Sequence, residues 1–147
     1  MFKHILVPTD GSKLSAKAEK AAIELAAALG AKVTGLHVLP ATTYDFVGDI
    51  VTTRLLTVAE AREREQKVAQ TAFKGCEKPA AKAHVAFAGK CVTSDDPYRS
   101  IIAAAKKSGC DVIVMASHGR RGLSGLLLGS ETHKVLTHSS IPVLVCR

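Results

Sequence analysis

Glycines, hydroxyl side chains and two arginines gather between Ala116 and Ser130, in the part of the chain best suited to hold a phosphate. Glycine lets a backbone approach a ligand closely, and the free N–H groups at a helix start favour an anion. Ser130 and Thr132 add hydroxyl groups, and Arg120 and Arg121 add positive charge. The alternative is a surface loop whose Gly-Ser end caps a helix, and the glycines alone do not decide between the two.

The glycine spacing does not match two widespread phosphate-binding motifs. A Walker A loop needs a lysine followed by serine or threonine, whereas Gly89-Lys90 is followed by Cys91. The glycines at 119, 122 and 125 are separated by two residues each, which is not the Rossmann fingerprint.

Other polar residues give weaker signals. Asp10 follows an apolar strand and precedes a helix, so it can cap that helix, contact a ligand, or do both. His118 can contact a phosphate or cap its own loop. His133 and His138 are five residues apart and share no helix face, so they predict no metal site. We predict no catalytic residues, because no nucleophile-elbow sequence is present.

Strand and helix patterns alternate along the chain. The apolar runs predict strands at His4–Val7, Lys32–Val38, Lys82–Ala88, Asp111–Ala116 and Ile141–Cys146. Helical spacing covers Leu14–Ala28, about Leu55–Lys74, a segment opened by Asp96-Pro97, and Ser130–Thr137. The segments Leu39–Arg54 and Gly89–Asp95 are expected to be a long connection and an irregular stretch. This order predicts an α/β domain with a parallel sheet and helices on both faces.

Length and composition restrict the class of protein. The 147 residues suit one domain, and 47% hydrophobic residues indicate a globular chain. The net charge of +7 is compatible with an anionic ligand, but the lysines are dispersed and aromatic residues are only 4%. We therefore expect no nucleic-acid partner.

Cellular location is inferred from the cysteines and the absence of targeting patterns. The four cysteines form no C-x-x-C pair, which favours free thiols in a reducing compartment. No apolar run approaches the ~18 residues that span a bilayer, and Met1–Pro8 reads as a strand rather than a leader. The expectation is a cytoplasmic protein without a membrane partner.

Several stretches of the chain resemble the ATP-binding universal stress proteins. The signature G-x2-G-x9-G-[ST] of that family is matched here as Ala116-x2-Gly119-x9-Gly129-Ser130, with alanine in place of the first glycine. The segments HILVPTDGS, LHVLP, DVIVMASHGRRG and SSIPVLVCR are also similar to the family. The resemblance covers nearly the whole chain, so residues 1–147 are expected to form one universal stress protein domain.

The resemblance implies a doubly wound sheet of five parallel strands in the order 3-2-1-4-5, with ATP bound between strands one and four, with or without Mg²⁺. It implies that Asp10 contacts the nucleoside, the main chain near Val38 meets adenine, Ala116 lies by the ribose, and Gly119, Gly129 and Ser130 hold the phosphates. The full set of expected nucleotide-binding residues is Pro8, Thr9, Asp10, Val38, Met115, Ala116, His118, Gly119, Arg120, Gly129, Ser130, Glu131 and Thr132.

The last strand predicts self-association. Pro142 cannot donate to a strand ladder, so Ile141–Cys146 should lie at an edge of the sheet. Its apolar residues Val143–Val145 carry no charge that would guard this edge. We expect a homodimer through this strand, which the family resemblance also implies.

The sequence favours an ATP-binding regulatory protein of the stress response. Two alternatives stay open: a dimeric scaffold that binds no nucleotide, and a slow ATPase or autophosphorylating enzyme. At most slow hydrolysis is expected, since no paired acid and base stands beside the glycine-rich segment.

Overall fold

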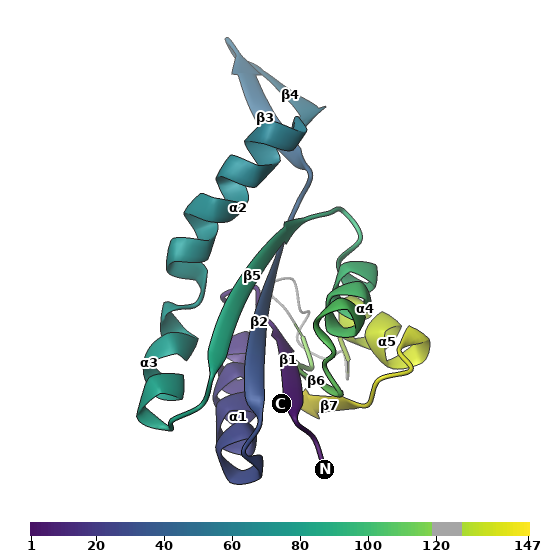
Figure 1. Ribbon diagram of the computed structural model, residues 1–147. Coiled ribbons are helices and arrows are strands. Elements are labelled where there is room, and N and C mark those ends of the chain that lie inside the picture. The colour runs from purple at the N-terminus through teal and green to yellow at the C-terminus, as the bar shows by residue number, and fades with distance from the viewer. Residues whose placement is uncertain (119–127) are drawn as a thin grey trace.

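Five parallel strands form the main sheet in this computed structural model, which describes residues 1–118 and 128–147 (Figure 1). They are β1 (His4–Pro8), β2 (Lys32–Leu39), β5 (Phe87–Thr93), β6 (Val112–Ala116) and β7 (Val143–Cys146). Their order across the sheet is β5-β2-β1-β6-β7. Counted along the main sheet alone this is 3-2-1-4-5, so the predicted fold class and strand order are confirmed.

Helices cover both faces of the sheet, and strand side chains alternate between two cores. One core holds Ile5, Val7 and Val112 with apolar residues of α1 (Lys13–Leu29) and α3 (Lys74–Lys82). The other holds Leu6 and Ile113 with residues of α4 (Pro97–Ser108) and α5 (Ser130–His138). The central strands are therefore apolar on both sides, as expected for a parallel sheet between two helical layers.

The segment Leu39–Arg54 is more ordered than predicted. It contains β3 (Thr42–Val47) and β4 (Ile50–Leu55), which pair as a separate antiparallel sheet. Gly48 begins the two-residue turn between them with a positive φ of 61°, a conformation that glycine adopts without strain. Figure 1 shows this hairpin projecting beyond the main sheet, near the start of α2 (Val58–Ala72).

The helix predicted at about Leu55–Lys74 is present as α2, but the predicted boundaries between residues 74 and 95 are wrong. Helical structure continues through α3 to Lys82, and the third strand of the main sheet is Phe87–Thr93, not Lys82–Ala88. The expected irregular stretch from Gly89 is in fact strand to Thr93, and the reason is packing against Phe73. A Cβ on Gly89 would lie 2.2 Å from the Phe73 ring, so the glycine gives this buried ring room on the sheet.

The last strand lies at an edge of the main sheet, as predicted. It begins at Val143, one residue after Pro142, whose carbonyl accepts a hydrogen bond from the N–H of Ile113 at 2.9 Å. Within the described residues, none of the helices combines the length and apolarity that crossing a membrane requires.

Candidate functional site

The strand order reverses between β1 and β6. From β1 the chain moves outward to β2 and β5 on one side, and then returns to place β6 on the other side of β1. Connections that follow β1 and β6 therefore diverge at the carboxyl edge of the sheet. Ligands of open α/β sheets bind at this point, so the topology predicts a site formed by the residues that follow Pro8 and Ala116.

A buried polar cluster holds the turn after β1. The hydroxyl of Thr9 donates to the carboxylate of Glu19 and lies 3.2 Å from the Oγ of Ser15. Thr9 also accepts a hydrogen bond from the N–H of Gly11 at 3.2 Å. Thr9, Ser15 and Glu19 are all buried, and burial together with a Glu19 hydrogen bond raises the pKa of the Cys76 thiol. The Thr9 side chain is thus engaged with α1, which fixes the turn at the site.

Asp10 and Ser12 have different structural roles at the start of α1. Ser12 is the N-cap, because its Oγ accepts the N–H of Ser15 at 3.1 Å. Asp10 instead accepts the N–H of Ser12 at 2.9 Å and shapes the turn. Asp10 remains partly exposed beside β1, so a ligand role for it stays a prediction.

The neighbouring strand contributes a histidine that the sequence analysis missed. His37 lies near the end of β2, and its Nδ1 is 2.8 Å from the carbonyl oxygen of Thr9. Val38 follows it and packs against the α4–α5 core. His37 lies in the family-like segment LHVLP, but its proximity to the β1 turn depends on the β1–β2 register, in which Pro8 lies opposite Leu36.

The end of β6 is tightly joined to the start of α5. The hydroxyl of Thr132 donates to the carbonyl of Ala116 at 2.9 Å, and the N–H of Gly129 donates to the carbonyl of Ser117 at 2.7 Å. A Cβ on Gly129 would lie 3.1 Å from that Ser117 oxygen and 3.2 Å from the Cα of His118. A side chain at 129 would push these backbone atoms away by a few tenths of an ångström, so glycine favours this close approach.

One histidine nitrogen at this junction is buried and has no partner in the part of the chain that the structure describes. The Nδ1 of His118 is 3.1 Å from the Oγ of Ser117, whereas its Nε2 has no hydrogen-bond partner within the described residues. A buried polar atom left unsatisfied costs free energy, so it indicates a place where a further group could bind.

The amino end of α5 has no side-chain cap among residues 1–118 and 128–147. Gly129 is the N-cap, and first-turn N–H groups such as that of Ser130 lack an intrahelical partner. Glu131 points elsewhere: its carboxylate accepts the N–H of Tyr98 at 2.9 Å and the ammonium of Lys134 at 2.8 Å. Glu131 therefore caps α4.

The structure brings most of the predicted residues to one edge, but not all with their side chains toward it. Met115 is buried in the α4–α5 core, so only its main chain could meet a ligand at the edge. Pro8 ends β1 and is partly buried. Gly119 and Arg120 lie outside the described residues.

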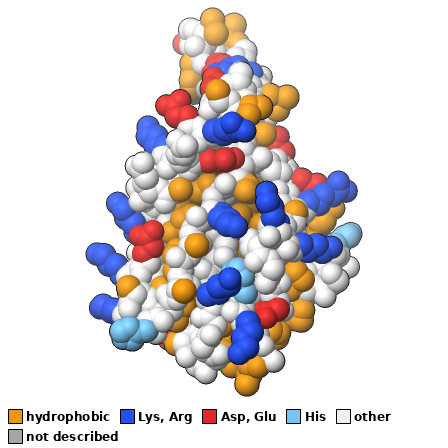
Figure 2. All heavy atoms as spheres, viewed as in Figure 1, with side chains coloured by type: hydrophobic (Ala, Val, Ile, Leu, Met, Phe, Trp, Pro, Cys, Tyr) orange, Lys and Arg blue, Asp and Glu red, His pale blue; other side chains and the backbone are white. Residues whose placement is uncertain are grey.

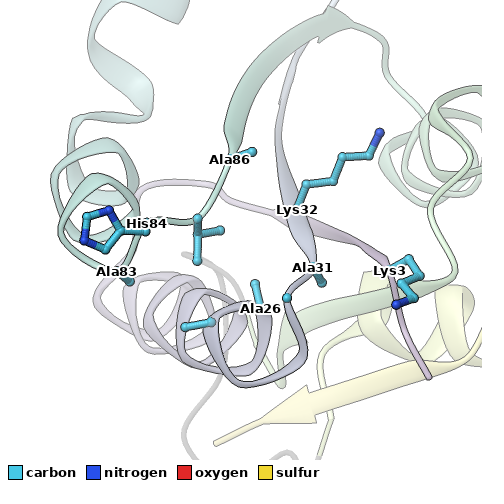
Figure 3. A pocket seen from close by; sticks show the side chains of 10 residues that line it. Lys3, Ala26, Ala31, Lys32, Ala83, His84 and Ala86 are labelled. Carbon is cyan, nitrogen blue, oxygen red and sulfur yellow. The ribbon is translucent and has the colours of Figure 1, made fainter.

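Two hollows are found at the opposite, amino edge of the sheet. One is lined by Lys3, Lys32 and His84 among others, and Figure 3 shows Lys32 extending away from Ala26 and Ala31. The second is lined by residues that include His4 and Lys90. Neither hollow is lined by a residue of the carboxyl edge, where open α/β sheets bind their ligands.

An open α/β sheet with its polar residues at the switch point defines the class of protein, and comparison with known proteins gives the family. The family model of the universal stress protein family matches residues 1–147. Universal stress protein YxiE of Bacillus subtilis is 35% identical over 150 residues, covering 100% of both chains. Universal stress protein MJ0531 of Methanocaldococcus jannaschii is 31% identical, covering 100% of this chain and 83% of its own. The chain belongs to the universal stress protein family.

Solved structures show the same fold. Universal stress protein UspA from Lactobacillus plantarum superposes with a TM-score of 0.78 at 24% identity, covering 99% of this chain and 97% of its own. A universal stress protein in complex with cAMP gives 0.71 at 21% identity, covering 99% and 97%. One from Archaeoglobus fulgidus in complex with dAMP gives 0.62 at 19% identity, covering 99% and 98%.

Proposed function

We propose that this chain is a regulatory protein that binds ATP at the carboxyl edge between β1 and β6. The observation that carries the proposal is the reversal of strand order at that point, beside an α5 amino end that no side chain in the described part of the chain caps. Family membership supports it, and two proteins of the same fold have been solved with adenine nucleotides, one with cAMP and one with dAMP.

The residues present fit a phosphate group in three respects. The start of α5 offers N–H groups with partial positive charge. The Nε2 of His118 is buried and unpartnered within the described residues, so it could meet a phosphate oxygen. Gly129 keeps the junction free of a side chain. ATP could bind with or without Mg²⁺, which is usually held largely by the phosphates themselves.

The nucleoside end would lie toward β1 and β2. Asp10 would contact the nucleoside, and the main chain at Val38 would meet the adenine. His37 joins these two strands through its 2.8 Å contact with the Thr9 carbonyl, so it would keep the two contacts in fixed relation. Ala116 would lie by the ribose, with its carbonyl already engaged by Thr132.

Slow hydrolysis at most is expected. Glu131 is the carboxylate closest in sequence to the α5 start, and it is engaged with Tyr98 and Lys134 rather than available as a base. A bound nucleotide that is hydrolysed slowly would suit a regulatory role, in which ATP changes how the protein binds its partners.

Calorimetric titration with ATP, ADP and cAMP tests the proposal directly, together with mass spectrometry of protein purified without added nucleotide. We expect saturable binding of ATP or retained nucleotide. A folded protein that shows no binding of any of the three at millimolar concentration would leave the scaffold function in its place.

We also propose that β7 mediates a homodimer. It is an edge strand, and Leu144 on it is 45% exposed. Sedimentation at micromolar concentration should show a dimer that Leu144→Glu dissociates. A wild-type chain that sediments as a monomer would contradict this interface without affecting the nucleotide site.

A further inference from the structure

A second group of polar side chains lies far from the proposed nucleotide site, near the starts of β1, β2 and β5. Residues opposite each other in neighbouring strands share a face of the sheet, and so do alternate residues along one strand. Lys32 lies opposite His4, and Lys90 lies opposite Leu36, so His4, Lys32, Thr34 and Lys90 share one face. Leu36 belongs to the α4–α5 core, so this is the face that those two helices cover.

These residues line the second of the two amino-edge hollows, here called the Lys32–Lys90 hollow. Its volume is about 320 Å³, within the range of small-molecule pockets. Phe87 and Ala88 give it an apolar wall, and Ser108, the last residue of α4, also lines it. Figure 2 shows basic side chains beside a histidine over the part of the visible face where Figure 1 draws β2 and β5.

The described lining of this hollow is basic and includes no carboxylate. Its ionisable side chains are those of His4, Lys32 and Lys90. Among residues 1–118 and 128–147, neither lysine forms a salt bridge. The carboxylate of Asp111 acts on His4, but it accepts the backbone N–H groups of Lys3 and His4 at 2.8 and 3.1 Å. The hollow therefore carries positive charge that no described lining residue neutralises.

The two lysines keep hydrogen-bond donors for a further group. The Nζ of Lys90 donates to the Oγ of Ser108 at 2.9 Å, which places this ammonium group at the end of α4. Lys32 extends away from Ala26 of α1, the helix that covers the other face of the sheet (Figure 3). An ammonium group has three donors and no acceptor, so a group that binds both lysines must bring acceptors, and preferably negative charge.

His4 links the charge in this hollow to a buried titratable group. Its side chain is buried, and burial lowers its pKa most. The charges of Lys32 and Lys90 lower this pKa further, whereas a hydrogen bond with the Ser108 backbone and the charge of Asp111 act in the opposite direction. Both ammonium groups are therefore close enough to act on the ring. An anion bound between them would oppose their effect and raise the pKa of His4.

We propose that the Lys32–Lys90 hollow binds a phosphate group, either as the free ion or as the monoester of a small molecule. The ammonium groups of Lys32 and Lys90 and the hydroxyl of Ser108 would donate to the phosphate oxygens. A phosphate with two negative charges would offset both lysines, and the organic part of an ester would contact the apolar wall at Phe87. This site lies at the edge opposite the proposed nucleotide site and does not depend on it.

Titration of the isotope-labelled, full-length chain with sodium phosphate, followed by NMR at constant ionic strength, tests the inference. The amide signals of Lys32 and Lys90 should shift saturably, and the pKa of the His4 ring should rise. The dissociation constant should be millimolar, because ion pairs between exposed groups are individually weak. Glycerol phosphate titrated in parallel distinguishes the two sources: tighter binding than inorganic phosphate assigns the hollow to an ester, and equal binding assigns it to the free ion.

The double variant Lys32→Gln, Lys90→Gln should raise the dissociation constant for phosphate at least tenfold, because it removes both ammonium groups from the hollow. The matched control is Lys106→Gln, Lys107→Gln, in the last turn of α4. Both control lysines are exposed, and neither lines the hollow. The two double variants remove the same net charge, so we expect the control to change the dissociation constant less than twofold.

Three results would overturn the inference. Equal losses in the two double variants would show a general attraction of anions to a basic chain. Shifts confined to the amides of Gly129 and Ser130 would place phosphate at the carboxyl edge alone. Without any saturable shift, the lysines would serve only to offset the negative end of α4. The amide spectrum of each variant shows whether it is folded, and none of these outcomes requires ATP to bind.

Discussion

The two edges of the main sheet are built differently. The carboxyl edge has few formal charges at the described positions, but it has a buried polar cluster around Thr9. Among the same described residues, the start of α5 has no side-chain cap and the Nε2 of His118 has no hydrogen-bond partner. The amino edge has two hollows lined by basic residues that include Lys32 and Lys90. Positive charge beside a hollow would select the amino edge as the site. Topology and the state of the backbone donors select the carboxyl edge.

The difference is one of preorganisation. At the carboxyl edge, the β1 turn is held by Glu19 and Ser12, and the α5 start is held by Gly129 and Thr132. At the amino edge, the side chain of Lys32 extends away from Ala26 and Ala31, which line the same hollow (Figure 3). Fixed donors recognise a phosphate at lower entropic cost than long, solvated lysines.

Among the substitutions that test this difference between the two edges, a change at Gly129 should have the largest effect on ATP affinity. Gly129→Val adds a branched side chain where a Cβ would already lie 3.1 Å from the Ser117 carbonyl. The junction of β6 with α5 must open, and the N–H groups move away from the phosphates. We expect ATP affinity to fall at least about 30-fold, or roughly 2 kcal/mol, measured by calorimetry.

A glycine at the amino edge provides the control. Gly30 adopts a φ of 62° with no atom within 4 Å of a hypothetical Cβ, so Gly30→Ala should cost about 1 kcal/mol of stability through backbone strain. It should leave ATP affinity unchanged. Equal affinity in Gly129→Val and wild type would remove the α5 start from the site.

Removal of the buried Glu19 carboxylate should have the next largest effect, a loss of folding stability together with weaker ATP binding. Glu19→Ala removes the carboxylate that accepts from the Thr9 hydroxyl and leaves only the longer 3.2 Å contact with the Oγ of Ser15. Loss of a buried hydrogen-bond partner costs about 1–3 kcal/mol. Glu19→Gln keeps an acceptor oxygen and should cost less. Chemical denaturation measures both. We also expect weaker ATP binding in the alanine variant, because the turn that carries Asp10 loses its support.

Thr34→Val is the corresponding change toward the amino edge. Thr34 Oγ1 lies 2.8 Å from the Nε2 of buried His4, so its loss should cost about 1–2 kcal/mol. ATP affinity should not change, since the contact lies at the far end of the strands. A drop in affinity as large as that of Glu19→Ala would show that stability alone, not position, controls binding.

Neutralising the amino-edge lysines should have little effect on nucleotide. We expect the double variant Lys32→Gln, Lys90→Gln to change ATP affinity less than about twofold at 0.15 M salt, where charges more than about 8 Å apart are largely screened. Calorimetry in parallel with wild type is the measurement. A tenfold loss would instead place the nucleotide in the amino-edge hollow and reverse the comparison.

The sequence predicts the main sheet well because the alternation of apolar strands and amphipathic helices leaves few topologies. The hairpin was missed although Gly48-Asp49, between runs rich in threonine, tyrosine and valine, is a known turn signal. The strand Phe87–Thr93 was misplaced because Gly89 suggests a break, and its role against Phe73 is visible only in three dimensions. His37 and Glu19 were missed for the same reason: their partners are set by register and helix packing, not by a motif.

The smallest expected effect is on the pH dependence of stability, and it tests the amino edge alone through His4. Burial, reinforced by the charge of Lys32, lowers the pKa of His4 below its ordinary value of about 6.5. The unfolded chain therefore takes up this proton at a higher pH than the folded chain. Stability from His4 is complete above about pH 6.5 and is lost as the pH falls toward the folded pKa.

His4→Asn removes this titration while retaining a polar side chain opposite Thr34. Denaturation at pH 7.5 and at pH 5.5 should show a smaller loss of stability in His4→Asn than in wild type. The exposed His133, replaced in the same way, should leave the wild-type loss unchanged. Added nucleotide should raise the stability of the wild type and of both variants equally, because the His4 proton and the proposed nucleotide site lie at opposite edges of the sheet. An ATP effect that changes with His4 would show that the two edges are coupled through β1, which joins them.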